Sequence, residues 1–294
     1  IIPTAIKNVT FPKAMRWGGK NMRFARPIRW MVALLNDNVL DVNLEGIKAS
    51  NVTKGHRFLG EREFEVNSVE DYFEKLEKNY IILDQHKRKA MIKEQAIEVA
   101  NSLGGEVELD DDLLEEITFL VEYPTAFYGE FEEDYVKLPK EVVTTPMKEH
   151  QRYFPVSKDG KLLPYFIAVR NGDSHRIDIV KAGNENVLKA RLADALFFYK
   201  EDTKKPLESF VDKLQTVVFQ AKLGTVYDKS LRIDKLSQTI LNELNMSESA
   251  KNTQRAAKLC KADLVTNMVF EFTELQGIMG RDYAKVGGEN EEVC

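Results

Sequence analysis

The sequence predicts an α+β N-terminal part, ending at about residue 175, followed by an all-helical part. Up to Asn171, short apolar segments bounded by turn residues alternate with helical patterns, whereas beyond it apolar residues recur only at helical spacing. Hydrophobic residues make up 43% and charged residues 30% of the 294 residues. This balance can bury a core, so it excludes a disordered chain and a coiled-coil rod, and the length fits two or three compact units.

Turn and capping signals predict the first elements. Met31–Leu35 is apolar and runs into a turn of Asn and Asp, so we expect a strand with Val39–Leu44 as its hairpin partner. Ser68-Val-Glu-Asp71 is a capping signal for a helix that continues to about Lys78. The short apolar run Ile81–Leu83 is predicted to be a strand.

A longer helix is predicted next, from about Gln85 to Ser102, because apolar side chains share one stripe and Gly104-Gly105 ends it. Leu113–Val121 has a helical pattern that is closed by Tyr123-Pro124, and Thr125–Phe131 is then predicted to be a strand.

Pro139 is predicted to start a further helix, which reaches His150. Tyr153–Val156 and Leu163–Val169 are expected to form a hairpin, since the segment between them contains the favoured pair Asp159-Gly160.

The all-helical part is predicted from four periodic segments, Ile177–Lys200, Leu207–Val218, Asp228–Leu244 and Ala250–Phe270. We therefore expect an α+β region at 1–175 with one or two subdomains, a helical connector at 176–214 and a separate helical domain at 215–294.

Composition excludes several classes of protein. No apolar run approaches the roughly 20 residues that a membrane helix needs. The only cysteines are Cys260 and Cys294, so the chain is not a disulfide-stapled secreted scaffold, and a reduced cytoplasmic setting is expected. The first residue is Ile1 and no basic-then-apolar leader follows it, while the last residues come directly after a helical pattern. We interpret both ends as cuts in a longer protein.

The net charge of −5 hides a strong asymmetry. Residues 1–36 contain seven Lys and Arg and no acid, whereas residues 94–136 contain many acids and neither Lys nor Arg. The basic segment could meet phosphates and the acidic segment would repel them. On charge alone we favour the alternative that both are solvated faces which pair with each other.

The first basic and aromatic cluster contains Arg23, Arg26 and Arg29 at intervals of three residues, with Trp17 and Trp30 on either side. Guanidinium groups bind phosphate or stack on bases, and Trp offers a stacking plane, so RNA contact is physically reasonable. The alternative, in which the Trp residues are core and the Arg residues pair with acids, has equal weight at this point.

Further clusters follow. Thr53–Gly60 is a basic loop with two glycines that let backbone approach a partner, although spacing alone favours a structural turn. Lys148, His150 and Arg152 cannot all share one helix face. Phe166–Asp173 is predicted to be a strand that ends in a polar turn, either a functional strand end or a plain turn.

Independent catalytic chemistry finds no support in the motifs. None of the four His residues lies after His175, and zinc-helix, Cys-x-x-Cys, phosphate-loop, dinucleotide and serine-hydrolase motifs are all missing. Asp263 alone suggests a structural acid rather than a metal ligand. We predict no catalytic residues and no metal site in this chain.

Ten strings, taken together, resemble the beta subunit of the bacterial two-subunit glycyl-tRNA synthetase. They occur in family order from about Phe11 to Tyr283. The strings are Met15–Gly18, Arg23–Trp30, Thr53–Phe58, Val121–Pro124, Met147–Pro155, Ala168–Gly172, Gly183–Ala195, Val218–Thr225, Lys261–Thr266 and Glu274–Arg281.

The resemblance implies an enzyme of two alpha and two beta chains that joins glycine to its tRNA with ATP and magnesium. It places the aminoacylation site, and with it ATP and Mg²⁺, on the alpha subunit. The beta chain of the family is longer than this sequence, and its anticodon-binding domain is absent here. The N-terminal part resembles editing-type modules of phenylalanyl-tRNA synthetase beta chains. The helical part resembles an HD-type phosphohydrolase domain that is catalytically dead, because the required His residues are missing, and is truncated at the C-terminus.

The leading hypothesis is a non-catalytic fragment that binds tRNA(Gly) and the alpha subunit, with no role at membranes or on DNA. The expected tRNA-contacting residues are Arg16, Trp17, Arg23, Arg26, Arg29, Lys54, Arg57, Lys148 and Arg152.

Two alternatives stay open. One is hydrolytic editing of mischarged tRNA by a pocket containing His56, His150 or Asn171. Glycine weakens this alternative, since a tiny pocket rejects larger amino acids by size and needs no second sieve. The other is a pure scaffold that holds the alpha subunit without touching RNA.

Overall fold

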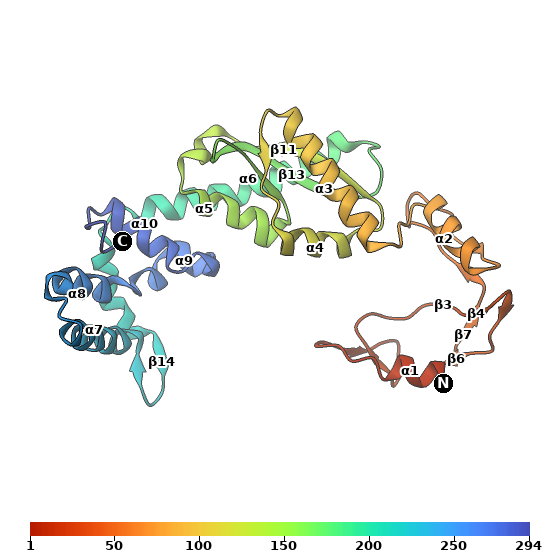
Figure 1. The fold of residues 1–294 in the computed structure, drawn as a ribbon, viewed down its shortest axis with the longest axis horizontal. Helices are drawn as coiled ribbons and strands as arrows, with labels where there is room; N and C mark the ends of the chain where they lie inside the picture. The colour runs from red at the N-terminus through yellow and green to blue at the C-terminus, as the bar shows by residue number, and fades with distance from the viewer. The chain divides into compact units, whose positions relative to one another are not determined.

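The computed structural model describes all residues from Ile1 to Cys294, and these divide into two compact units. The first unit comprises residues 1–98, 110–126 and 169–175, and the second comprises 99–109, 127–168 and 176–294. The chain is mixed α/β with small sheets, and its C-terminal part, blue in Figure 1, is helical. This confirms the predicted fold class at that level.

The first sixty-five residues form short ribbons with little core. In this stretch only Val42, Leu44, Thr53 and His56 are buried. The elements are α1 (Ile2–Lys7), the antiparallel pairs β1 (Met15–Arg16) with β2 (Arg23–Phe24), β4 (Leu34–Leu35) with β5 (Asn38–Val39) and β8 (Val52–Thr53) with β9 (Phe64–Glu65), and a three-stranded sheet in the order β3 (Met31–Val32), β7 (Ile47–Ser50), β6 (Asn43–Leu44).

The predicted hairpin at 31–44 is correct only at its tip. Leu34 pairs with Val39 across a turn in which Asn36 has a φ of 54°, a conformation that Asn tolerates better than most residues. The rest of the predicted partner, at Leu44, pairs instead with Ile47. Glu45 fixes this region, because its carboxylate accepts hydrogen bonds from the backbone N–H groups of Asn21 and Met22.

The helices of the first unit follow the capping signals. Helix α2 (Val69–Lys78) begins where the Ser68 hydroxyl accepts a hydrogen bond from the Asp71 N–H at 3.1 Å. The other helices at this point of the chain are α3 (Gln85–Ser102) and α4 (Asp111–Leu120), the latter capped by Asp110. All three predicted helices are confirmed.

The predicted strand at Ile81–Leu83 is wrong. The Ile82 N–H donates to the Glu122 carbonyl, but the carbonyls of Ile82 and Leu83 accept from the Arg88 guanidinium. Because a side chain occupies these acceptors, no ladder of backbone hydrogen bonds continues through the segment.

A four-stranded sheet has the order β10 (Glu106–Val107), β12 (Phe154–Lys158), β13 (Lys161–Asn171), β11 (Pro124–Glu130). The predicted hairpin is confirmed: β12 and β13 join through Asp159 and Gly160, both with positive φ. The strand predicted at Thr125–Phe131 is confirmed as β11, and the helix after Pro139 as α5 (Lys140–Thr145), which continues as a π-helical turn over Pro146–Gln151.

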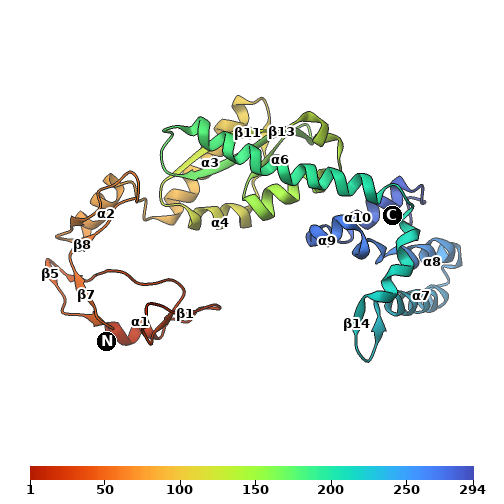
Figure 2. The ribbon, with the colours of Figure 1, turned by 180° about the vertical axis from the view of Figure 1, so that it is seen from behind.

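The helical part consists of α6 (Ile177–Asp202), a 3-10 stretch at Leu207–Thr216, the small hairpin β14 (Val218–Gln220) and β15 (Gly224–Thr225), and the helices α7 (Val226–Glu243), α8 (Ala250–Leu259), α9 (Asn267–Glu271) and α10 (Ile278–Val286). Helix α6 lies across one face of the sheet in the second unit (Figure 2). No helix of the structure is both long and apolar enough to cross a membrane.

The continuous helix predicted at Ala250–Phe270 is wrong, because it is divided between α8 and α9 by a 3-10 turn. The buried Asp263 lies in this turn and accepts a hydrogen bond from the Gly277 N–H at 2.5 Å. Thr266 then caps α9. The bond to Gly277, 14 residues away, and the local Thr266 cap both compete with helix continuation.

The core of the second unit is built around Phe166, which is fully buried and stacks on Tyr153 with ring centroids 4.5 Å apart. A Cβ atom at Gly129 would lie 2.2 Å from the Phe166 ring, so only glycine fits on the facing strand. Burial of Tyr153 itself raises the pKa of its hydroxyl to about 12.

We expect Gly129→Ala to destabilise the chain by about 1–3 kcal/mol, because the added methyl group must displace a packed ring. Gly183→Ala is the matched control: it lies inside α6 with open space around it and should stabilise by up to about 1 kcal/mol. Urea unfolding of both variants measures the difference, and equal midpoints would contradict the packing argument.

Candidate nucleic-acid interface

Residues 53–61 of the first unit form a loop that Asn79 closes. The His56 N–H donates to the Asn79 carbonyl at 2.9 Å, and the Glu61 N–H donates to Asn79 Oδ1 at 2.8 Å. The loop also closes on itself, because the Gly60 N–H donates to the His56 carbonyl. Asn79 is only 4% exposed, so these bonds are protected from water.

The two glycines of this loop are required by close backbone contact. A Cβ at Gly60 would lie 2.6 Å from the Asn79 carbonyl oxygen, and one at Gly55 would lie 2.9 Å from the Asn79 Cβ. The segment is therefore a structural turn, as its spacing predicted. The turn fixes the backbone from which the side chains of Lys54 and Arg57 extend.

A cavity of about 1100 Å³ opens beside this loop, and we name it the basic hollow. Its Lys and Arg side chains come from two segments of the chain, around Arg29 and from Lys54 to Arg62. It is lined by Arg29, Trp30, Lys54, Gly55, His56, Arg57, Glu61, Arg62, Glu63 and Glu122, all of the first unit.

Trp30 offers the hollow an aromatic plane. The residue is 44% exposed, and its indole Nε1 donates to the Thr53 hydroxyl at 3.3 Å, which fixes one edge of the ring. The Lys54 ammonium lies 5.3 Å from the ring centroid, within the range of a cation–π contact. A planar base can stack on such a ring, and a phosphate can bind the ammonium.

The cations of the hollow are largely free to bind an anion. Arg29, Arg57 and Arg62 form no ion pair in the structure. Lys54 pairs with Glu63 at 3.2 Å, but both side chains are about half exposed or more, and such a pair is weak enough to exchange. The alternative in which Arg23, Arg26 and Arg29 pair with acids is therefore not what the structure shows.

The other predicted RNA-contacting residues lie elsewhere. Trp17 and Arg26 line a second, smaller cavity of about 160 Å³ in the first unit, and the Trp17 indole donates to the Phe24 carbonyl. Arg16 and Arg23 face each other across the β1–β2 ribbon. Lys148 and Arg152 belong to the second unit, on the π-helical turn and at its end.

Of the three residues predicted for an editing pocket, only His56 lines the hollow, and it is 2% exposed. The side-chain oxygen Oδ1 of Asn171 accepts hydrogen bonds from the backbone N–H groups of Glu122 and Tyr123. His150, in the second unit, stacks on Phe272 with centroids 5.8 Å apart. Asn171 thus orders the backbone beside the hollow, and His150 packs against the core.

Sequence reasoning missed Arg62, Glu122 and Asn79. Asn79 follows the end of α2 and meets the loop through contacts 18 to 23 residues apart, which no spacing rule predicts. Arg62 directly follows the Thr53–Gly60 string, and its charge was the available signal. No group of three or more His, Cys, Asp or Glu side chains is arranged to hold a metal ion.

Comparison with known proteins places the chain in a family of aminoacyl-tRNA synthetase subunits. The family described as "Glycyl-tRNA synthetase beta subunit" matches residues 1–294. The chain belongs to this family, which confirms the resemblance carried by the ten strings.

Among its curated relatives, a "Glycine--tRNA ligase beta subunit" from Clostridioides difficile (strain 630) is 74% identical over 293 residues, covering 100% of this chain and 43% of that protein. The protein of the same name from Syntrophomonas wolfei is 53% identical over 290 residues, covering 98% of this chain and 42% of its own length. The chain thus spans about two-fifths of the length of these relatives.

We expect Asn79→Ala to loosen the loop of the basic hollow by about 1–3 kcal/mol, because the Glu61 N–H loses its buried acceptor. Hydrogen–deuterium exchange over residues 53–61 should speed up while the β12–β13 hairpin keeps its protection. Asn101→Ala is the control, since Asn101 is exposed and its side chain makes no hydrogen bond. Unchanged exchange at 53–61 would show that Asn79 does not hold the loop.

Proposed function

We propose that this chain is the part of a glycyl-tRNA synthetase beta subunit that contacts and positions tRNA(Gly), and so supports ATP-dependent glycylation by the complete enzyme. The observation that carries the proposal is the basic hollow, where three guanidinium groups without ion pairs surround an exposed, edge-fixed indole. Phosphate contacts supply affinity and aromatic stacking holds single-stranded bases, and this hollow offers both groups.

The name "beta subunit" of the relatives implies an alpha partner. We propose an assembly of two alpha and two beta chains in the cytoplasm, with the aminoacylation site, ATP and Mg²⁺ on the alpha subunit. In this proposal the present residues are non-catalytic. The editing-type likeness at 1–175, the connector at 176–214 and the degenerate HD-like likeness at 215–294 belong to the same proposal and rest on the resemblance.

Hydrolytic editing is the second candidate, because His56 lines the same hollow. A general base must come within hydrogen-bond reach of the attacking water, and an imidazole that is 2% exposed must first open toward solvent. Release of alanine from mischarged tRNA(Gly) by the chain, lost in His56→Ala, would favour editing over positioning.

The test of the leading proposal is binding of tRNA(Gly) and of an unrelated tRNA across a salt series. Arg29→Ala, Arg57→Ala and Arg62→Ala should each weaken binding of both tRNAs and lower the slope of log K against log salt by about 0.7–0.9. Each variant removes one phosphate-binding charge, whereas Lys93→Ala, an exposed cation on α3 outside the hollow, should leave the slope unchanged.

Two outcomes would count against this assignment. Slopes that stay unchanged in all three Arg variants would remove the hollow from the RNA contact. Failure of the chain to bind either tRNA would favour the scaffold alternative, in which this part of the subunit holds the alpha chain.

A further inference from the structure

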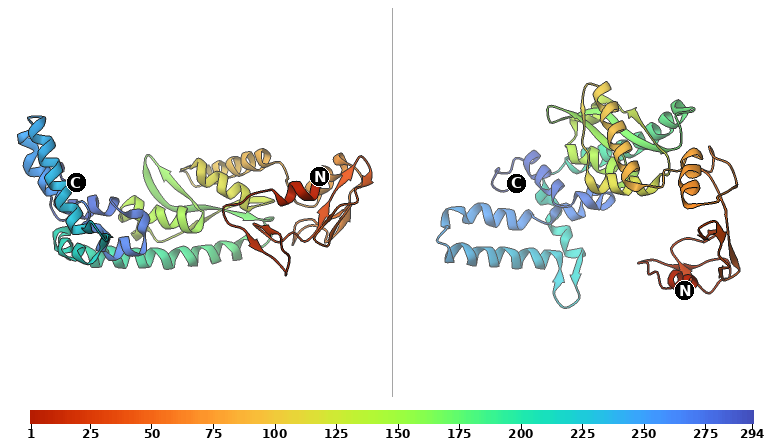
Figure 3. Two further views of the ribbon diagram at one scale, coloured as in Figure 1. Left: turned by 90° about the horizontal axis from the view of Figure 1, so that it is seen from below. Right: turned by 45° about the vertical axis from the view of Figure 1, so that its right-hand side comes forward.

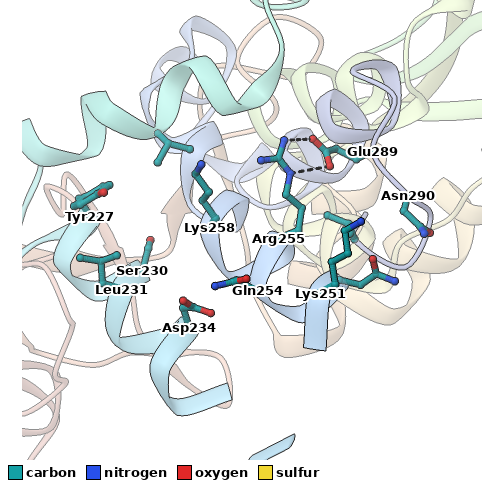
Figure 4. Close-up of a pocket in the computed structure, with 13 residues that line it drawn as sticks. Tyr227, Ser230, Leu231, Asp234, Lys251, Gln254, Arg255, Lys258, Glu289 and Asn290 are labelled. Carbon is teal, nitrogen blue, oxygen red and sulfur yellow. Dashed lines mark hydrogen bonds and ion pairs between the residues drawn. The ribbon is translucent and has the colours of Figure 1, made fainter. Parts of the chain in front are cut away.

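Helices α7 and α8 of the second unit run side by side (Figure 3). A cavity of about 620 Å³ opens between them (Figure 4). We name it the α7–α8 groove. Leu231 and Asp234 of α7 face Lys251 and Arg255 of α8 across it, and Glu289 and Val293 also line it.

One wall of this groove is firmly built. Arg255 donates to both carboxylate oxygens of Glu289, at 2.9 and 2.5 Å (Figure 4). It also pairs with Glu208 at 2.9 Å. Gly288, with a φ of 82°, ends α10 and lets the Glu289 N–H donate to the Ala284 carbonyl. The segment that carries Glu289 and Val293 is therefore held in place without any ligand.

Inside the groove, by contrast, polar groups lack hydrogen-bond or ion-pair partners. Asp234 Oδ1 is shielded from solvent, yet it accepts no hydrogen bond. Buried acceptors are nearly always paired, so a donor is missing here. Lys251 forms no ion pair, and Leu231 is 52% exposed although it lines the cavity. A missing occupant would have to supply a donor, an acceptor and an apolar side chain.

We infer that the α7–α8 groove is the docking site of a segment that follows Cys294 in the full-length beta subunit. The chain covers 43% of the Clostridioides difficile relative, so more than half of such a subunit lies outside residues 1–294. Val293 forms part of the groove itself, so the continuing chain starts beside it. A segment of the same chain therefore reaches the groove over a short path, at low entropic cost.

The groove also defines the chemistry of this segment. Apolar side chains pack on Val211, Leu231 and Val293, a backbone N–H or a basic side chain donates to Asp234 Oδ1, and an acceptor meets Lys251. An amphipathic helix lying between two helices supplies these groups on one face. This inference stands apart from the proposed tRNA contact, which lies in the other unit.

The experiment uses the full-length beta subunit with a photo-crosslinking residue at position 231. We expect a crosslink within one chain to a peptide beyond residue 294. The control is position 236, on another face of α7 and 62% exposed, which should not reach that peptide. A crosslink to a second beta chain, a crosslink to the alpha subunit in the assembled enzyme, or no protein crosslink from position 231 would each overturn the inference.

A second measurement does not depend on crosslinking chemistry. In the full-length subunit, Leu231→Cys should react with a maleimide about tenfold more slowly than Leu236→Cys, because docking shields it. Mass spectrometry of the labelled peptides separates these sites from other cysteines, and circular dichroism checks the fold. Equal rates in the subunit alone would overturn the inference. Protection of Leu231→Cys that appears only when ATP or GTP is added would also overturn it, because the occupant would then be a nucleotide and not a segment of the chain.

Discussion

The scarcity of buried apolar side chains in the first sixty-five residues determines how the region around the basic hollow is held together. With four buried side chains in that stretch, hydrophobic burial cannot hold the ribbons together, and polar contacts take its place. Glu45 gathers two backbone N–H groups and the Lys20 side chain bonds to its carbonyl. The Met22 N–H first, and then Lys7 and the Asn21 N–H, hold the pKa of the Glu45 carboxyl below its usual value. Asn79 has the same role for the loop of the basic hollow.

The second unit is held in the opposite way. Its core contains fully buried Phe166, Leu188 and Leu192, and the buried acid Asp202 joins three of its helices. Asp202, at the end of α6, accepts hydrogen bonds from the backbone and side chain of Asn267, from the Met268 N–H and from the Tyr283 hydroxyl. A carboxylate with this many donors stays ordered without a counter-ion, so α6, α9 and α10 are joined at one point.

Local rules predicted most of the fold, and distant contacts account for what they missed. The Ser68 cap, the Asp159-Gly160 turn and the stripe of α3 are encoded within a few residues, and each element appears as expected. The strand prediction for Ile81–Leu83 was wrong because the Arg88 guanidinium donates hydrogen bonds to the carbonyls of Ile82 and Leu83. The helix after Ala250 is broken by a hydrogen bond between Asp263 and Gly277.

The candidate site follows the same division. Lys54 and Arg57 stand in one short string and were predicted, and Arg29 was predicted from its spacing. That these residues share a cavity with Arg62 and Glu122 depends on folding of segments up to about ninety residues apart, for which the sequence holds no periodic signal. The hydrogen bonds that the Asn171 side chain accepts and the stacking of His150 on Phe272 also depend on contacts between distant segments.

The placement of the two tryptophans has a practical consequence. Trp17 and Trp30 both lie in the first unit, and the second unit has none. Intrinsic indole emission of this chain therefore observes only the region that contains the basic hollow. Trp30 is partly open to water and lies beside the Lys54 ammonium, so a base that stacks on it would quench its emission directly. Melting of the helical region would leave the indole emission unchanged.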